Sequence, residues 1–357
     1  MQSRRGFLRG ALATAALPAT SWASVGNPSH LSAAQDPSGD YALYGLREDG
    51  TRAFRVSLPQ RGHAAAAHPS APEAVAFARR PGTFALVLDC SDGHVQHRLD
   101  APEGHHFYGH GAFSADGAFL FTTENHVATG RGIVGVWDRA SGYARIDQIS
   151  SHGIGPHEII RMPDGGLAVA NGGIRTHPDT GRQKLNLETM RPNLAILDRN
   201  GRLSDLADVP GELHMNSLRH ISVQAQGRVA CGFQWQGDPF DTPALLAIYG
   251  AQGLEFIEFE EGLSQRMKGY IGSVGWLDTR QVLVSSPRGG LLINYDSMTG
   301  ASVISRLDDV CGVAASTTGG LATDGLGRLH AVSGKQNVTL ASYPLAFDNH
   351  LIRIGTA

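Results

Sequence analysis

The chain has 357 residues, among them 33 acidic side chains, 30 Lys or Arg and 45 Gly, and its formal net charge is −3 at pH 7. The basic side chains form no cluster, and this mildly acidic balance argues against nucleic acid or an anionic membrane surface as a partner. Helical periodicity is hard to find after the N-terminal segment, so the sequence favours short strands joined by turns.

The N-terminal segment has the features of an export signal in the right order. Residues 3–9 (SRRGFLR) resemble the S-R-R-x-F-L-K pattern of twin-arginine signal peptides, and a mildly apolar run follows over residues 10–17. Residues 21–23 (SWA) then supply the small-x-small pattern of a signal peptidase site. We predict a twin-arginine signal peptide over residues 1–23, cleavage after Ala23 and a periplasmic mature protein.

The rest of the chain is expected to hold a linker over residues 24–40 and one domain over residues 41–357. No stretch in it is apolar over the roughly 20 residues that a membrane span needs. Its three cysteines, Cys90, Cys231 and Cys311, lie far apart, and their odd number leaves at least one without an intramolecular disulfide partner. The fold is therefore not expected to depend on disulfides.

Short β-rich runs, each bounded by Gly, Asp or Asn, follow one another along the chain. They occupy residues 84–88, 119–123, 133–137, 167–170, 194–197, 229–233, 245–248, 282–285 and 291–295.

Turn sequences recur between these runs in a constant phase. Turns between first and second strands are residues 114–117 (SADG), 162–165 (MPDG) and 224–227 (QAQG), and turns between third and fourth strands are residues 137–142 (WDRASG), 197–201 (LDRNG) and 295–300 (YDSMTG). Four strands per unit, repeated every ~40–50 residues, are typical of a β-propeller, whereas a β-sandwich lacks this repeated phase. We predict an all-β, seven-bladed, WD40-like propeller.

Alignment of the repeats on the start of each first strand gives seven equivalent positions. They are His63, His110, His157, His220, Ser273, Cys311 and His350, at steps of 47, 47, 63, 53, 38 and 39 residues. The longest step contains an insertion over residues 172–191. Because first strands line the central channel of a propeller, these side chains are expected to form a ring near one mouth of the channel.

The last blade is expected to join the two ends of the chain. A C-terminal strand at about residues 351–354 is its predicted innermost strand, and strands at about 41–46 and 53–58 lie outside it. Such pairing removes the open edge that the ring of sheets would otherwise leave. Only three strands are recognisable in this blade.

Two interpretations of the ring stay open. Neutral imidazole binds iron, copper, zinc and nickel, and a thiolate would favour softer ions. The candidate metal ligands are therefore His63, His110, His157, His220, Cys311 and His350. Alternatively, these polar side chains only line a water-filled channel. A seven-bladed channel is wide, so three imidazoles with water are a better ligand set than all six side chains.

The loops between second and third strands are expected to open at the same mouth and to bind a cofactor or ligand. Their candidate residues are Asn125, His126, Arg131, Arg175, His177, Trp235 and Arg288. Loops of this kind supply the few aimed polar groups of a small-molecule pocket, although each residue by itself is more typical of a solvated loop, and the case rests on their convergence on one face.

Motifs of known enzyme classes do not decide the function, since G-x-S-x-G, H-E-x-x-H and a Walker loop are all missing from the sequence. His157 and Glu158 are neighbours on a strand and are expected to face opposite sides, so they should not act together on one substrate atom. Three hypotheses follow: an accessory or binding protein that holds a metal ion or metal chelate, a metal-dependent oxidoreductase or lactonase-like hydrolase, and an interaction scaffold without a small-molecule site.

Residues 151–158 (SHGIGPHE), 170–174 (ANGGI), 176–182 (THPDTGR) and 189–192 (TMRP) resemble a bacterial family of twin-arginine-exported proteins of unknown function. Its members are similar to seven-bladed propellers of the quinoprotein amine dehydrogenase type. They are often encoded beside imelysin-like proteins and di-haem oxidoreductases linked to periplasmic iron uptake. The resemblance implies a role near iron handling, with imelysin-like or haem-containing proteins as partners, but it supplies no catalytic or ligand residues.

Overall fold

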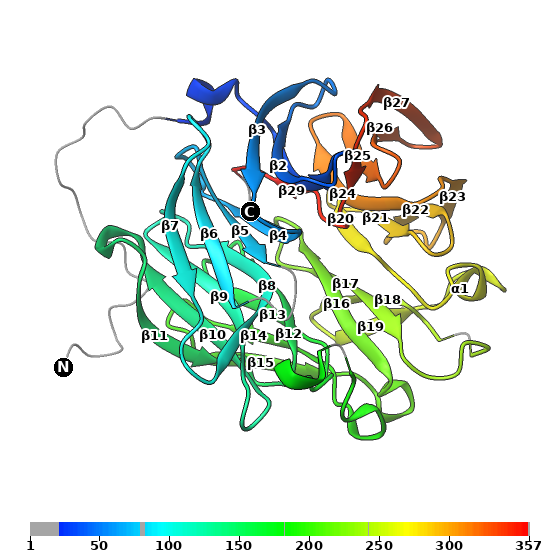
Figure 1. Ribbon diagram of the computed structural model, residues 1–357. Helices are drawn as coiled ribbons and strands as arrows, with labels where there is room; N and C mark the ends of the chain where they lie inside the picture. The colour runs from blue at the N-terminus through cyan, green and yellow to red at the C-terminus, as the bar shows by residue number, and fades with distance from the viewer. Residues whose placement is uncertain (1–20, 79–82, 182, 242, 356–357) are drawn as a thin grey trace.

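The computed structural model describes residues 21–78, 83–181, 183–241 and 243–355, so most of the predicted signal peptide lies outside the described residues. Seven antiparallel sheets stand around a central axis like the blades of a propeller (Figure 1). The predicted seven-bladed, all-β architecture is confirmed.

Six blades consist of four consecutive strands each, the first of which lies nearest the axis. They are β4 (Gly62–Ala67), β5 (Glu73–Ala78), β6 (Phe84–Asp89) and β7 (Val95–Asp100); β8 (His105–Phe113), β9 (Phe119–His126), β10 (Arg131–Asp138) and β11 (Ala144–Ser150); β12 (Pro156–Arg161), β13 (Leu167–Asn171), β14 (Asn193–Leu197) and β15 (Leu203–Asp208); β16 (Asn216–Val223), β17 (Val229–Trp235), β18 (Leu246–Gly250) and β19 (Gly253–Ile257); β20 (Ser273–Trp276), β21 (Gln281–Ser286), β22 (Leu291–Asp296) and β23 (Ser302–Arg306); and β24 (Val310–Ser316), β25 (Gly319–Asp324), β26 (Arg328–Ser333) and β27 (Gln336–Ser342).

The seventh blade joins the two ends of the chain. Two short C-terminal strands, β28 (Ala346–Phe347) and β29 (Ile352–Arg353), both pair with β1 (His30–Gln35), and β2 (Tyr41–Leu46) and β3 (Arg52–Leu58) complete the sheet. In Figure 1 the blue N-terminal strands therefore lie beside the red C-terminal segment.

The segment predicted as a linker, residues 24–40, contains β1, and this corrects the expected boundary of the domain. The first five residues of β1 are buried, and most of them are small: the strand reads HLSAAQ. Ala and Ser carry little β propensity and the strand is covered on both faces, so it shows neither the aromatic and β-branched composition nor the alternation by which strands are recognised.

The core lies between neighbouring blades, where the two faces of adjacent sheets meet. Val134 and Val136 of β10 pack with Ile159 of β12 and Val169 of β13 in one such layer, and all four side chains are almost fully buried. Burial on both faces makes the inner strands of each blade nearly continuous apolar runs, as the sequence indicated.

Within the described residues, helical structure consists of one short α-helix, α1 (Leu263–Arg266), and 3-10 turns outside the blades. The 3-10 turns are η2 (Trp22–Val25), η3 (Arg139–Ser141), η4 (Pro178–Thr180), η5 (Leu187–Thr189) and η6 (Gly211–Leu213). No helix in the described part of the chain is long and apolar enough to cross a membrane.

The turn η2 is part of the packed structure. The indole of Trp22 is 6% exposed. It donates a hydrogen bond from Nε1 to the carbonyl oxygen of His68 at 2.9 Å. It also stacks on Phe54 with a centroid separation of 6.4 Å. The cleavage predicted after Ala23 would thus remove a buried side chain.

Candidate functional site

Bulges occur in the innermost strands at the positions that the repeat alignment picked out. The pairing register shifts between Gly62 and Ala65, Phe107 and Gly111, Pro156 and Glu158, Leu218 and His220, and Val310 and Val313. A bulge bends its strand and re-aims a side chain. By contrast, β20 pairs with β21 without a shift, and its aligned residue is Ser273.

Five imidazoles meet at the centre of the propeller as a result. In order around the cluster, the ring centroids of His63, His110, His157, His220 and His350 are separated by 4.9, 4.8, 5.2, 5.2 and, back to His63, 4.8 Å. We call this group the histidine cluster. Each of its members except His63, which is half-buried, is at least 92% buried.

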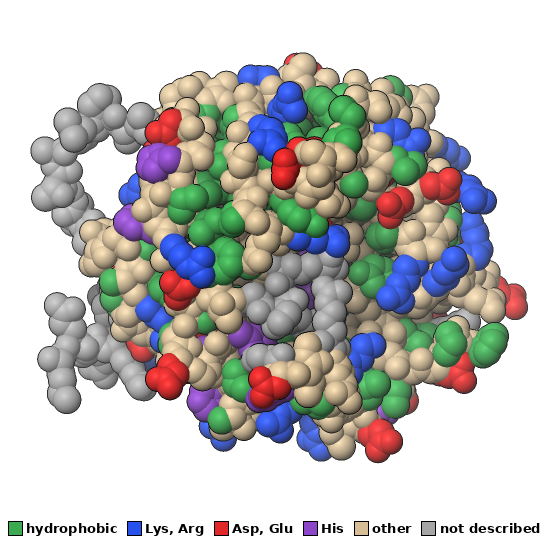
Figure 2. Space-filling model, viewed as in Figure 1, with side chains coloured by type: hydrophobic (Ala, Val, Ile, Leu, Met, Phe, Trp, Pro, Cys, Tyr) green, Lys and Arg blue, Asp and Glu red, His purple; other side chains and the backbone are tan. Residues whose placement is uncertain are grey.

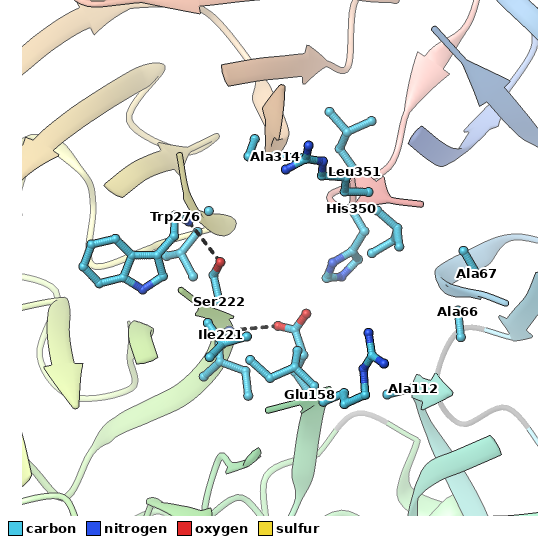
Figure 3. A pocket seen from close by; sticks show the side chains of 18 of the residues that line it. Ala66, Ala67, Ala112, Glu158, Ile221, Ser222, Trp276, Ala314, His350 and Leu351 are labelled. Carbon is cyan, nitrogen blue, oxygen red and sulfur yellow. Dashed lines mark hydrogen bonds between the residues drawn. The ribbon is translucent and has the colours of Figure 1, made fainter. Parts of the chain in front are cut away.

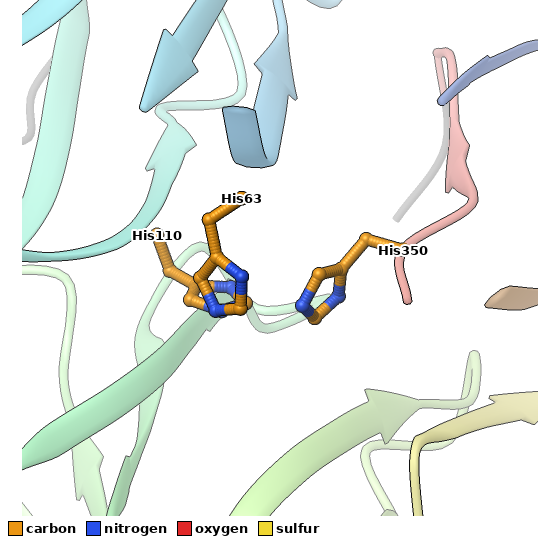
Figure 4. Close-up of side chains that lie close together, drawn as sticks. All are labelled: His63, His110 and His350. Atoms are coloured by element: carbon orange, nitrogen blue, oxygen red, sulfur yellow. The ribbon is translucent and has the colours of Figure 1, made fainter. Parts of the chain in front are cut away.

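Three members of the cluster converge most closely. His63, His110 and His350 each place one nitrogen within 4.8 Å of the corresponding nitrogens of the other two. Figure 4 shows the three rings approaching one another from separate blades. His110 Nε2 is buried and has no hydrogen-bond partner, so its ring is not held by a neighbour on that side.

A carboxylate joins the cluster from β12. The oxygen atoms of Glu158 lie 3.8 Å from His110 Nδ1 and 3.5 Å from His220 Nδ1. The backbone N–H of Ile221 donates to Glu158 Oε2 at 3.0 Å and fixes its position. The bulge at His157 turns Glu158 toward the histidines of the two neighbouring blades, which the simple alternation of strand side chains did not anticipate.

Burial sets the protonation of these groups. It lowers the pKa of His220 to about 3, with Arg219 contributing. Burial and the neighbouring His350 hold the pKa of His110 well below the usual range. Burial and the neighbouring Arg219 do the same for the pKa of His157. Burial also raises the pKa of Glu158 to about 7. Neutral imidazoles are the form that coordinates a metal.

The two remaining ring positions do not join the cluster. Cys311 is buried, and its Sγ–H donates to the carbonyl oxygen of Asp309 at 3.0 Å. Burial and the adjacent Asp309 raise its pKa well above the usual range, so the thiol stays protonated. Ser273 accepts a hydrogen bond from the N–H of Val313 at 3.2 Å and links two blades. All three cysteines are buried and free, as expected of a fold without a disulfide framework.

A pocket of about 600 Å³ begins at the cluster and follows the channel toward the far ends of the innermost strands. Glu158, His110 and His350 line one end, and the turns between first and second strands, such as those at Ser114 and Gln224, line the other. Figure 3 shows Glu158 and His350 pointing into this space between walls of small side chains.

The candidate residues on the rim loops lie elsewhere. None of Asn125, His126, Arg131, Arg175, His177, Trp235 and Arg288 lines the pocket. Their loops join second to third strands and so stand at the opposite rim, where the contacts described for them are with other residues of the protein. Asn125 Nδ2 lies 3.0 Å from His106 Nε2, Trp235 Nε1 donates to Asp238, and Arg288 stacks over Tyr270.

The remaining rim residues behave in the same way. His126 Nδ1 lies 2.7 Å from Thr129 Oγ1, Arg175 donates to the carbonyl oxygen of Ala128, and His177 Nδ1 accepts from the N–H of Asp179. Arg131 is exposed. The pocket described above thus lies on the other side of the histidine cluster from these residues, and a ligand site among the rim loops stays a prediction.

On the face that Figure 2 shows, basic and acidic side chains are interspersed over the surface. This distribution agrees with the mildly acidic composition.

Comparison with known proteins places the chain in a family. Residues 56–354 match the family described as "Protein of unknown function (DUF1513)". None of the curated proteins matches the chain.

Solved structures show the fold. A chain of the "Crystal Structure of Mitotic Checkpoint Complex" superposes with a TM-score of 0.57 at 12% identity, covering 79% of this chain and 80% of that chain. The "Structure of U3-55K" gives 0.55 at 12% identity over 95% and 97% of the two chains. The RRP9 WD40 repeats give 0.53 at 12% identity over 84% and 87%. The likeness is one of architecture alone, whereas the family match spans most of the sequence: this protein belongs to the family of unknown function DUF1513.

Proposed function

We propose that this protein is a periplasmic binding protein that holds a divalent transition-metal ion, or a chelate of one, at the histidine cluster in the service of iron acquisition. The observation that carries the proposal is the convergence of three imidazole nitrogens, from His63, His110 and His350, within 4.8 Å of one another.

The donor set fits such an ion. Metal–nitrogen bonds to imidazole are about 2.0–2.1 Å long, so two nitrogens on one ion lie at most about 4 Å apart. Small rotations of the three side chains would bring them to that separation. An ion would also satisfy His110 Nε2, which has no hydrogen-bond partner. Glu158 offers an anionic ligand beside them.

The composition of the site narrows the choice of metal. Imidazoles with one carboxylate suit iron, zinc, copper and nickel, and the protonated Cys311 thiol removes the bias toward softer ions. Among these metals we propose iron, because the sequence resembles a family linked to periplasmic iron uptake. The same resemblance supports imelysin-like or haem-containing proteins as partners.

The test of metal binding uses the mature protein isolated from the periplasm. We expect about one iron per chain by elemental analysis, and saturable Fe(II) or Zn(II) binding after the metal is stripped. His110→Ala and His350→Ala should weaken binding roughly 100-fold, and Glu158→Gln, which keeps an acceptor for Ile221, about tenfold. His214→Ala is the matched control, because His214 lies outside the cluster and only contacts the Gly211 carbonyl oxygen.

Circular dichroism on each variant separates loss of ligands from loss of fold. Substoichiometric metal in the wild type, or equal affinity in all folded variants, would refute the metal site.

Export is tested separately by cell fractionation. Arg4→Lys with Arg5→Lys conserves charge but removes the paired arginines, so this variant should stay in the cytoplasm while the wild type reaches the periplasm. Equal distribution of both proteins would contradict a twin-arginine route.

A further inference from the structure

The channel pocket brings two arginines into the same space as the histidine cluster. Arg161 of β12 and Arg353 of β29 line it together with Glu158, His110 and His350. Neither guanidinium has a described carboxylate within the 4.0 Å of an ion pair. The carboxylate that acts on Arg161 is Asp116, whose Oδ1 is already bonded to Ser114 Oγ at 2.6 Å and to the N–H of Ala118 at 3.0 Å.

The charge of this space is positive once a metal is bound. A divalent ion with three neutral imidazoles and the single negative charge of Glu158 keeps a positive charge, and two guanidinium groups add to it. Burial already lowers the pKa of Arg161, which means that water compensates its charge poorly. The carboxylate that acts on Arg353 is Glu48, whose oxygens already accept a hydrogen bond from the N–H of Thr317. Partly buried positive charge that no close carboxylate neutralises is costly, so the pocket favours an anionic occupant.

The walls indicate what kind of anion it is. Small apolar side chains, among them Ala66, Ala112 and Ala314, line the sides, and Trp276 also borders the pocket (Figure 3). A volume of about 600 Å³ suits a small organic molecule. Apolar walls would contact the carbon skeleton of a carboxylic acid, whereas inorganic phosphate has no such skeleton.

We infer that the pocket binds a small polycarboxylate, one carboxylate of which completes the coordination of the metal while another pairs with Arg161 or Arg353. The inference rests on the proposed metal site and specifies the ligand that would share it. Paired guanidinium and carboxylate groups form strong, charge-assisted hydrogen bonds, which gives the arginines their role in recognition.

The experiment measures succinate binding by calorimetry to the full-length protein, both stripped of metal and loaded with Zn(II), with the zinc content checked afterwards. We expect succinate to bind the zinc-loaded protein roughly tenfold more tightly than the stripped protein, and uncharged succinamide not to bind. Arg161→Gln and Arg353→Gln should each weaken succinate binding about tenfold without lowering zinc affinity. Arg306→Gln is the control, because the Arg306 side chain is 85% exposed and lies outside the pocket.

The outcomes separate this inference from the proposed function. Zinc binding without succinate binding would overturn the inference and leave the metal site intact, whereas no zinc binding would overturn both. Succinate binding that is unaffected by both arginine variants would refute the assigned contacts. Phosphate binding as tight as succinate binding would overturn the carboxylate class in favour of a general oxyanion site.

Discussion

Gly109 controls how closely two imidazoles approach at the centre of the propeller. It precedes His110 in the β8 bulge and adopts φ +97°, a conformation that side-chain-bearing residues rarely adopt. A Cβ at this position would lie 2.6 Å from His63 Cδ2. Gly312 allows a similar close approach beside His350, because a Cβ at position 312 would lie 2.5 Å from the backbone nitrogen of Leu351. Glycine is therefore required at the points where the strands approach the cluster.

We predict that Gly109→Ala destabilises the fold by roughly 1–3 kcal/mol and weakens metal binding, because the new methyl group displaces the His63 ring. Gly104→Ala is the matched control: Gly104 also has a positive φ, +73°, but nothing lies within 4 Å of its Cβ position. Urea unfolding and zinc titration of both variants measure the two effects. Equal zinc affinities in the two variants would show that His63 does not depend on the space beside Gly109.

At the scale of elements, the seventh blade depends on strands from both ends of the chain. β28 and β29 each pair with β1 through two residues, and His350 lies between them, so the last imidazole of the cluster is held by the closure of the ring. The turn η2 packs on the same blade, where Trp22 and Val25 join a cluster that includes Leu31 and Leu43. Closure of the ring and the position of His350 in the histidine cluster are thus coupled through this blade.

We predict that Trp22→Ala in the full-length chain lowers the free energy of unfolding by roughly 3 kcal/mol, because it empties a buried site and removes the hydrogen bond to His68. A chain that begins at Ser24, as cleavage after Ala23 would produce, loses the same contacts and should be destabilised by a similar amount. Denaturant unfolding of the three proteins tests this. An unchanged midpoint in the chain that begins at Ser24 would mean that Trp22 contributes nothing to the folded state.

At the scale of the whole molecule, closure also depends on a buried neutral histidine. His30 Nε2 donates to the carbonyl oxygen of Ala315 at 2.9 Å, and Nδ1 lies 2.8 Å from Ser29 Oγ. Its partner Ala315 belongs to β24, so the contact joins the closing blade to its neighbour. Burial lowers the pKa of His30 to about 4 from 6.5.

We predict that the protein loses stability between pH 6.5 and about pH 4. In this window the unfolded chain binds a proton at His30 and the folded chain does not, so the free energy of unfolding decreases as the pH is lowered. His30 accounts for up to about 3 kcal/mol of the loss. Unfolding in the presence of EDTA should show a shallower pH dependence for His30→Gln, whose amide can still donate to Ala315. The same pH slope in both proteins would contradict neutral burial of His30.

Much of the architecture was predictable because it repeats. Turn sequences in constant phase gave seven blades, and the alignment of first strands brought His63, His110, His157, His220 and His350 to equivalent positions, which the structure places together. Repeats make this inference robust, since an error in one unit is visible against the others. The strand β1 was not predicted, because its small residues show no periodic pattern of apolar and polar side chains.

The arrangement at the centre depends on side-chain directions that a sequence pattern does not reveal. A bulge of one residue decides which way a side chain points, so Glu158 faces the cluster and not the opposite side of its strand. Cys311 occupies an equivalent position, but its thiol bonds to the backbone of Asp309. The pocket extends from the cluster along the channel toward the turns between first and second strands, away from the rim loops.

The sequence by itself determined the number of blades, the joining of the chain ends and the residues at the axis, since each follows from local turns and their spacing. Only the tertiary structure decided that five imidazoles and Glu158 lie together at the centre, with Arg161 in the pocket beyond them. The reason is geometric: the distance across the axis is set by bulges, by glycine at two points of close approach and by the packing of seven sheets against one another, and none of these is encoded in a local run of residues.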